Sequence, residues 1–453
     1  DSVIGVYGEY GPDQVRVAHY WIAAAQFIPD ARELNDFVLK KSAEHLVRHA
    51  SDFWSEWIGE RDFADLSDEH AALFRKSLMY MRAHVDVDGG VIASLDSDIL
   101  QFAMDTYAYI WPRDAAFVSM VFARAGKPMV AKRFLDFCRG IFQKEGYFMH
   151  KYLPDGSLGS SWHPWIQNGE TQLPIQEDET ALVILCAEAY FNSVHDGEFL
   201  ELIYNSFIGR AADFMVEYRD AETKLPKATY DLWERKRGTH TFTTSATAAA
   251  LESAANLAGV LGKTDAQKRY AAAAEEIREA LVQYLWDEKA GMFVNMLNRT
   301  PQGIVYDRTL DASSAYGAFT FGVLPVDDPK LERAWEKTIK VLSEEIPSGG
   351  IARFEDDDYY RDQGRRQGNP WIITTLWYAE YLIARAKKRE DLSRVRDIFD
   401  WVVRHAQPSG VLSEQQHPQT GVQVSVAPLA WSHAAYVNAV ILYLEKRHQL
   451  PAA

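Results

Sequence analysis

Cysteine, long apolar runs and positive charge are all scarce in this sequence of 453 residues. Its two cysteines, Cys138 and Cys186, fall in helical patterns and lack the spacing of a metal site, so we expect free buried thiols rather than a disulfide. No apolar run reaches the roughly 18 residues of a membrane span, and the sequence does not open with an export signal. We therefore expect a cytoplasmic protein without a membrane partner.

The charge balance excludes another class of partner. Lys and Arg number 48 against 64 Asp and Glu, for a net charge of −16. Nucleic acids and anionic membranes bind basic surfaces, so we expect neither as a partner. A neutral, polar ligand is compatible with this charge. Aromatic residues make up 13% of the chain, which suits stacking on sugars, although large cores and interfaces also use aromatic rings.

Apolar residues recur every three to four positions from about residue 67 onward, which predicts a succession of amphipathic helices. Thr264 with Gln267 has the pattern of a capping box, and Asp328-Pro329 is a typical helix start. We expect twelve helices, near residues 67–83, 113–125, 128–143, 178–192, 197–217, 244–261, 264–286, 313–321, 329–345, 370–388, 390–406 and 429–447.

The connections between these helices alternate in length. Most even-to-odd connections are short, as in antiparallel helical hairpins, whereas most odd-to-even connections are long. If the helices pair in this way, the even-numbered helices all start at one end of the assembly. Carboxylates, arginines and tryptophans gather at those starts, so the sequence predicts one polar, aromatic pocket there.

Residues 1–66 have a different pattern. Residues 15–25 alternate partly, as in a strand, and residues 31–57 predict a helix. We expect a residual β segment at 1–30, a linker helix at 31–66 and a helical barrel at 67–453.

Two glutamates stand in similar loops, each just before a long helical pattern. Glu234 follows Trp233, and Glu414 precedes Gln415. Cleavage of a sugar linkage needs one protonated carboxyl and one ionised carboxylate, which activates water or attacks directly. The alternative is an ordinary glutamate at a helix start, stabilised by the helix dipole.

Taken together, these loops resemble the glucoamylase family of inverting glycoside hydrolases, in the family's order and over roughly residues 50–447. The matching segments are 107–114 (YAYIWPRD), 230–234 (YDLWE), 412–415 (LSEQ), 429–432 (LAWS), Arg353 and 369–371 (NPW). The resemblance implies an all-α fold, a six-hairpin (α/α)6 barrel. It also implies an N-terminal β-sandwich domain missing from this chain, with residues 1–58 as its last strand and linker.

The resemblance also implies roles for single residues. Glu234 would be the general acid and Glu414 the general base, with the carboxyls about 6.5–9.5 Å apart to leave room for water. The other expected site residues would bind sugar, wall the pocket or orient the two glutamates: Tyr107, Trp111, Arg113, Asp114, Asp178, Asp231, Trp233, Arg353, Trp371 and Gln415. A helix-start ion pair for Arg113 and Asp114, packing for Tyr107 and a surface salt bridge for Arg353 are the alternatives.

The expected function is therefore an exo-acting, inverting α-glucoside hydrolase that releases glucose from the non-reducing end of α-glucans or α-gluco-oligosaccharides. Maltose and starch are favoured, and isomalto-linked sugars and trehalose stay open. The alternative is a catalytically weak carbohydrate-binding or regulatory protein on the same barrel.

No cofactor and no metal are expected. Histidines 150, 163, 240, 417 and 433 lack metal-ligand spacing, which favours solvated or core roles, and the acidic run 355–358 favours a solvated loop over a calcium site. The chain departs from fungal relatives in two places: Arg235 follows Glu234, and the loop before Asp178 lacks their tryptophan beyond the cleavage point.

Overall fold

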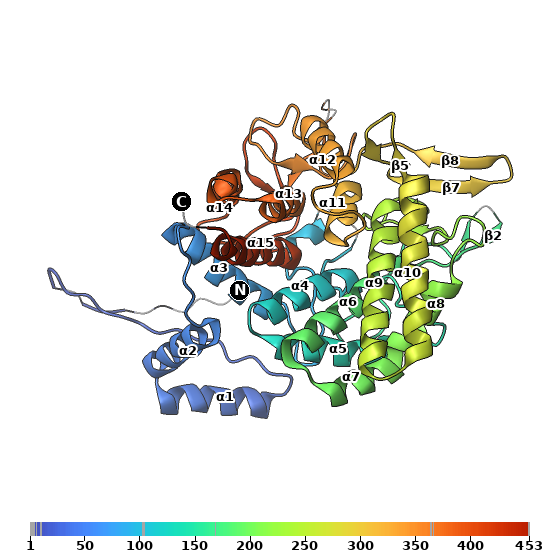
Figure 1. The fold of residues 1–453 in the computed structure, drawn as a ribbon. Coiled ribbons are helices and arrows are strands. Elements are labelled where there is room, and N and C mark those ends of the chain that lie inside the picture. The colour runs from blue at the N-terminus through green and yellow to red at the C-terminus, as the bar shows by residue number, and fades with distance from the viewer. Residues whose placement is uncertain are drawn as a thin grey trace. The chain divides into compact units, whose positions relative to one another are not determined.

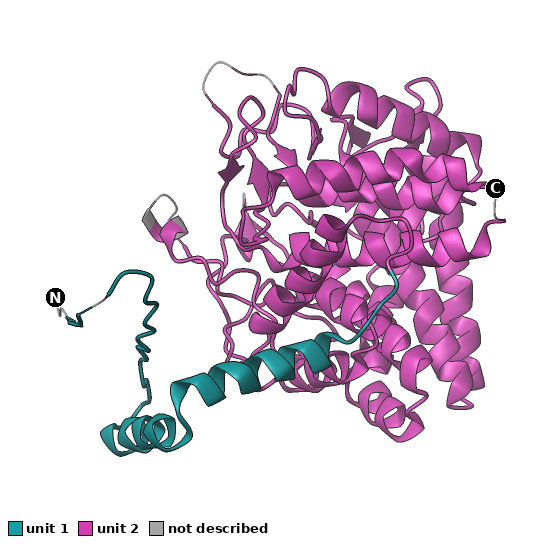
Figure 2. Cartoon of the chain, turned by 90° about the vertical axis from the view of Figure 1, so that its left-hand side faces the viewer, with its two compact units in different colours: residues 1–62 teal, residues 63–453 magenta. Residues whose placement is uncertain are grey.

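Alternating helices build the large unit of the chain, residues 63–453. The computed structural model describes residues 5, 7–9, 11–101, 105–167, 169–362, 365 and 367–451. Residues 1–62 form a separate unit (Figure 2).

Six helices form an inner ring in which each helix contacts the next and the last contacts the first (Figure 1). They are α4 (Pro112–Arg124), α6 (Glu177–Val194), α9 (Thr241–Val260), α11 (Ala312–Thr320), α13 (Ile372–Arg385) and α15 (Ala430–Gln449). Most of their residues are buried on every face, as expected for helices enclosed between neighbours and an outer layer. Small residues such as Ala250 and Ala254 of α9 are part of this buried core.

An outer layer of amphipathic helices covers the ring. These helices are α3 (Asp68–Ala83), α5 (Pro128–Ile141), α7 (Gly197–Ile203), α8 (Gly209–Glu217), α10 (Thr264–Leu285), α12 (Pro329–Leu342) and α14 (Ser393–His405). A π-helical turn, Tyr204–Ile208, joins α7 to α8, and two short 3-10 helices span Asp98–Gln101 and Arg389–Leu392. The predicted all-α (α/α)6 barrel is confirmed, and the twelve predicted helices lie within a few residues of the observed ones.

Two small antiparallel sheets lie beside the starts of inner helices. One has the order β3 (Thr229–Tyr230), β4 (Arg237–His240), β7 (Met296–Thr300) and β8 (Gly303–Asp307). The other has the order β12 (Gln423–Val424), β11 (Gln415–Gln416), β10 (Pro370–Trp371) and β9 (Ile351–Ala352). The first sheet holds the loop 231–236, and the second joins the loops before α13 and α15 by pairing Trp371 with Gln415.

Two hairpins complete the strand inventory of the described residues. β1 (Ile166–Gln167) pairs with β2 (Glu170–Thr171), and β5 (Trp286–Asp287) pairs with β6 (Met292–Phe293).

Local predictions at two helix starts have different outcomes. Asp328 caps α12, because its side chain accepts a hydrogen bond from the N–H of Lys330. The capping box at Thr264 is wrong: α10 starts at this residue, and Lys263 occupies the cap without a side-chain hydrogen bond.

The N-terminal unit corrects two further predictions. Residues 11–27 contain no strand, since no neighbouring strand pairs with them in the described structure. The predicted linker helix is two helices, α1 (Ile28–Lys41) and α2 (Ala43–Ile58). They separate at Ser42, which has a φ of 71° and caps α2 through its hydroxyl. The N-terminal β-sandwich domain stays a prediction.

Among the described residues, no helix is long and apolar enough to cross a membrane. Cys138 and Cys186 are free and buried, as predicted.

A buried carboxyl links three inner helices. Glu380 of α13 accepts a hydrogen bond from the Asn438 amide of α15 at 2.8 Å and one from the Tyr316 hydroxyl of α11 at 3.1 Å. Burial raises the pKa of Glu380 to about 7 against the opposing effect of these hydrogen bonds. The fold therefore favours the protonated carboxyl.

Replacing this carboxyl should change how stability depends on pH. In the unfolded chain Glu380 regains a pKa of roughly 4.3, so its protonated form stabilises the fold at low pH, and this contribution is lost as the pH rises through about 7. Glu380→Gln mimics the protonated form. Its free energy of unfolding, relative to that of the wild type, should therefore rise by about 3 kcal/mol between pH 4 and pH 8. Thermal midpoints at several pH values measure this. Exposed Glu279→Gln is the control, and a difference independent of pH for Glu380→Gln would contradict the account.

Candidate active site

A cavity of about 410 Å³ lies among the starts of the inner helices. Nine of the twelve predicted site residues line it: Tyr107, Trp111, Arg113, Asp114, Trp233, Glu234, Arg353, Trp371 and Glu414. Both glutamates thus face one space, although they are 180 residues apart in the chain. The other three, Asp178, Asp231 and Gln415, are buried and do not line the cavity, but each is bonded to a residue or loop that does.

The loop that carries Glu234 closes between β3 and β4. Asp231 organises it, since its carboxylate accepts hydrogen bonds from the N–H groups of Arg235 at 2.6 Å and Lys236 at 2.9 Å. These bonds accompany a φ of 64° at Glu234, a left-handed conformation that costs a non-glycine residue about 1–3 kcal/mol. The loop structure thus fixes the backbone at Glu234 in a conformation that it would not adopt alone.

Arg113 lies in the first turn of α4 and is almost completely buried. Its guanidinium donates to Asp178 at 3.0 Å and to the side-chain oxygen of Gln176. The same group lies 3.6 Å from Asp114 and 4.0 Å from Glu234. Burial raises the pKa of Asp114 to about 7, although the charge of Arg113 opposes this.

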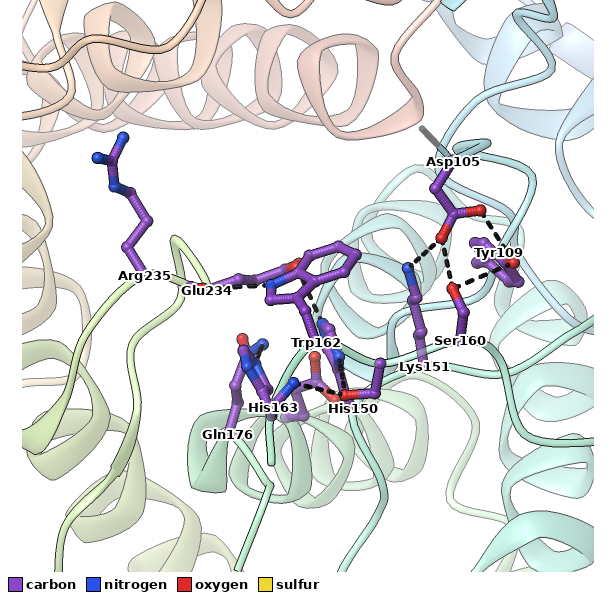
Figure 3. Close-up of polar contacts among 12 residues, drawn as sticks. Asp105, Tyr109, His150, Lys151, Ser160, Trp162, His163, Gln176, Glu234 and Arg235 are labelled. Carbon is purple, nitrogen blue, oxygen red and sulfur yellow. Dashed lines mark hydrogen bonds and ion pairs between the residues drawn. The ribbon is translucent and has the colours of Figure 1, made fainter. Parts of the chain in front are cut away.

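Glu234 has a second neighbour, a histidine, that the sequence did not reveal. Nε2 of His150 lies 2.9 Å from Oε2 of Glu234 (Figure 3). Burial raises the pKa of Glu234, but the charge and contact of His150, with a contribution from Arg113, outweigh it and bring the pKa down to about 2.

Glu414 is held by neutral donors. Its carboxylate accepts hydrogen bonds from the Ser425 hydroxyl at 2.6 Å, the Gln415 amide at 3.1 Å and the Tyr107 hydroxyl at 3.3 Å. Gln415 is itself oriented by the amide of Asn369 at 2.9 Å. Burial raises the pKa of Glu414 above its ordinary value, against the effects of Ser425 and of the Arg353 charge.

Arg353 is a buried cation surrounded by aromatic rings. Its guanidinium lies 4.3 Å from the ring of Trp371 and 5.1 Å from that of Trp233. It also makes two hydrogen bonds of 2.8 Å to Asp357. The surface salt bridge is therefore excluded for Arg353. The prediction of a solvated loop at 355–358 is wrong for Asp357, which is fully buried because it neutralises this guanidinium.

Several residues of the cavity were missed in the sequence. Trp162 lines it and donates from its indole N–H to the carbonyl oxygen of Glu234 at 3.3 Å. No sequence pattern singled out Trp162, because it lies in a loop without helical or strand periodicity. Tyr359 also lines the cavity and exchanges a hydrogen bond of 2.8 Å with Tyr107. Arg235, noted as a departure from fungal relatives, lines the cavity too.

The described residues include no group of three or more His, Cys, Asp or Glu side chains arranged to hold a metal ion.

Together, these features define a class: an (α/α)6 barrel with an aromatic pocket and two carboxyl groups at the end where its inner helices start. The chain belongs to glycosyl hydrolases family 15, whose family model matches residues 69–401 and 395–441. The resemblance inferred from the loops is thereby confirmed.

Curated relatives and solved structures agree with this family. The chain is 26% identical to an uncharacterized glycosyl hydrolase of Methanocaldococcus jannaschii over 417 residues, which cover 88% of this chain and 61% of that protein. It is 23% identical to a trehalase of Mycolicibacterium smegmatis, over 86% of this chain and 58% of the trehalase. The chain thus spans about three fifths of the length of these relatives.

Among solved structures, the chain is similar to a bacterial glucoamylase in complex with acarbose, with a TM-score of 0.72, 21% identity, and coverage of 93% of this chain and 62% of that one. It is also similar to a glucoamylase from Saccharomycopsis fibuligera, with a TM-score of 0.68, 19% identity, and coverage of 85% and 97%. Both similarities support the fold.

The Asp231 hydrogen bonds make a testable contribution to the loop. Asp231→Ala leaves the N–H groups of Arg235 and Lys236 without their acceptor, which should lower the free energy of unfolding by about 1–3 kcal/mol. Asp231→Asn keeps an acceptor oxygen and should lose less. Denaturant unfolding of both variants measures the difference, and equal losses would contradict this role.

Proposed function

We propose that this protein is an exo-acting glycoside hydrolase that releases glucose from the non-reducing end of α-glucosides with inversion. The observation that carries the proposal is the presence of Glu234 and Glu414 on the wall of one cavity, held by separate sheets and with different partners. Two carboxyl groups with different surroundings are what acid and base catalysis of glycoside cleavage requires.

In this proposal Glu234 protonates the glycosidic oxygen and Glu414 removes a proton from the attacking water. The three hydrogen bonds to Glu414 favour a fixed orientation of its carboxylate, as a base that aligns a water molecule needs. Inversion requires the carboxyls to be about 6.5–9.5 Å apart, which stays a prediction.

The remaining residues of the cavity suit the recognition of a sugar. Arg113 and Asp114 offer hydrogen-bond donors and acceptors side by side, which match adjacent hydroxyl groups. Trp111, Trp233 and Trp371 offer flat apolar surface. The volume of about 410 Å³ lies within the range of small-molecule sites, which supports binding of a chain end rather than a long stretch of polymer.

The substrate class is an α-glucan or α-gluco-oligosaccharide. Similarity to glucoamylases favours maltose and starch, and the relatives named trehalase bring trehalose into the same class of substrates. The proposal needs neither a cofactor nor a metal ion, because proton transfers between carboxyls, water and substrate complete the reaction.

In the unliganded protein the pKa values of the two glutamates run in the opposite order to these roles: that of Glu234 lies below its ordinary value and that of Glu414 above it. Burial raises the pKa of Glu234, and the nearby His150 and Arg113 lower it by more. The partner of Glu234 is an imidazole, a group that can itself carry a proton.

A substrate panel with matched variants tests the proposal. Glucose release from maltose, isomaltose, trehalose and soluble starch should be detectable for at least one substrate. Glu234→Gln and Glu414→Gln should each lower kcat on it by about 100-fold to 10,000-fold, as expected for the loss of a general acid or base. Glu279→Gln, on the exposed face of α10, should retain full activity.

Unchanged hydrolysis in both site variants would overturn the catalytic roles. Binding of these sugars by the wild type without any glucose release would favour the alternative, a carbohydrate-binding protein on the same barrel.

A further inference from the structure

We propose that His150 stores the proton that Glu234 delivers, so that the two side chains act as one acid. The inference rests on the proposed function and deepens it, because it assigns a positioning residue to the proton donor.

One ring nitrogen of His150 lies within ion-pair distance of the Glu234 carboxyl. The ring is buried, with Nε2 at 2.9 Å from Oε2 of Glu234 (Figure 3). Its Nδ1 lies 2.9 Å from the Ser161 hydroxyl. The ring stacks on His163 with a centroid distance of 4.3 Å, and Trp162 packs edge-on at 5.0 Å. These contacts restrict rotation of the ring away from Glu234.

The neighbouring His163 cannot take this role. The oxygen of Gln176 accepts from Arg113, so the nitrogen of the same amide is the atom that faces Nε2 of His163, at 3.1 Å. An amide nitrogen only donates, and Nε2 of His163 must therefore accept and carry no proton. Burial, with the charge of His150, also lowers the pKa of His163 to about 3. His163 is neutral, so the mobile proton belongs to the His150 and Glu234 pair.

The surroundings explain why the carboxyl needs this partner. Two cations lie near it: Arg113 from α4 at 4.0 Å, and Lys151, which follows His150 in the sequence. Arg235, the next residue after Glu234, pairs instead with Asp358. Lys151 is buried beside the Trp162 ring at 4.1 Å and pairs with Asp105 at 3.2 Å. Asp114, Asp178 and Glu179 are acidic groups of the same region, and each of them pairs with Arg113. Beside these cations a carboxyl alone would release its proton well below neutral pH. An imidazole partner gives the pair a second group that can hold the proton while the carboxyl is ionised.

The proton then moves in two steps. When a sugar enters and displaces water, the ion pair loses solvation, which favours the neutral form. The Nε2–H bond of His150 breaks and an O–H bond forms on Glu234. The carboxyl next gives this proton to the glycosidic oxygen as the C–O bond breaks, while Glu414 takes a proton from the attacking water. Glu414 releases its proton to solvent after the reaction, and the pair regains one from solvent.

His150→Gln tests this inference. The glutamine amide can still donate to Glu234 but cannot release a proton. With the best substrate among maltose, isomaltose and trehalose, the basic limb of the pH profile of kcat/KM should move toward acid by at least about one pH unit. Relative to the wild type, kcat/KM should fall by about tenfold or more above pH 7 and by less at pH 5. His163→Gln is the matched control, and its basic limb should stay in place because His163 holds no mobile proton.

A second substrate separates proton supply from structure. α-Glucosyl fluoride has a leaving group that departs without protonation, so His150→Gln should hydrolyse it within about threefold of the wild-type rate. His150→Asn, which is too short to contact Glu234, serves as a second variant and should show the same pattern.

Either of two results would overturn the role of His150: an unmoved basic limb, or an equal loss at every pH with both kinds of substrate. These results are distinct from a failure of the proposed function, in which Glu234→Gln would itself keep full activity on glucosides.

Discussion

The whole site depends on one constraint: the inner helices all run in the same direction around a closed ring. Each outer helix returns the chain to the same end, so every connection into an inner helix opens there. Helix N-termini carry partial positive charge, which stabilises carboxylates placed at them. Asp114 and Asp178 in the first turns of α4 and α6, and Asp311 at the cap of α11, occupy such positions.

At this common end, the two small sheets place the two glutamates in different environments. The β3 and β4 hairpin holds Glu234 beside Arg113 and His150. The second sheet holds Glu414 among hydroxyl and amide donors, and Arg353 nearby is already neutralised by Asp357. One carboxyl thus has a partner that can exchange a proton with it, whereas the other has partners that fix a carboxylate in place. This asymmetry is the physical basis for assigning different roles to two residues of the same type.

Much of this arrangement could be predicted from the sequence, because amphipathic helices repeat their apolar residues every three to four positions. The twelve helices were predicted from spacing, and nine of the cavity residues from loops that resemble those of a known family. Features that depend on how the loops fold were not predicted. Asp357 looked solvated because nothing in its acidic run indicates that Arg353 folds back onto it. The extended segment at 15–25 had the alternation of a strand but has no pairing strand in the described structure.

His150 is the clearest example of a site residue that the sequence did not predict. It lies 84 residues before Glu234 in the chain, in a loop without periodicity, and only the closure of the ring brings the two together. A lone histidine in such a loop is ordinarily a solvated or core residue, and no local signal marks this one as different.

The anomeric form of freshly released sugar tests the central claim most directly, because it records on which face of the glucose the water attacked. Proton NMR during the first minutes of hydrolysis distinguishes the forms before they equilibrate. A general base across the cavity from the acid predicts β-glucose as the first product from an α-glucoside. Initial release of α-glucose would contradict the assignment of Glu414 as a base that acts through water.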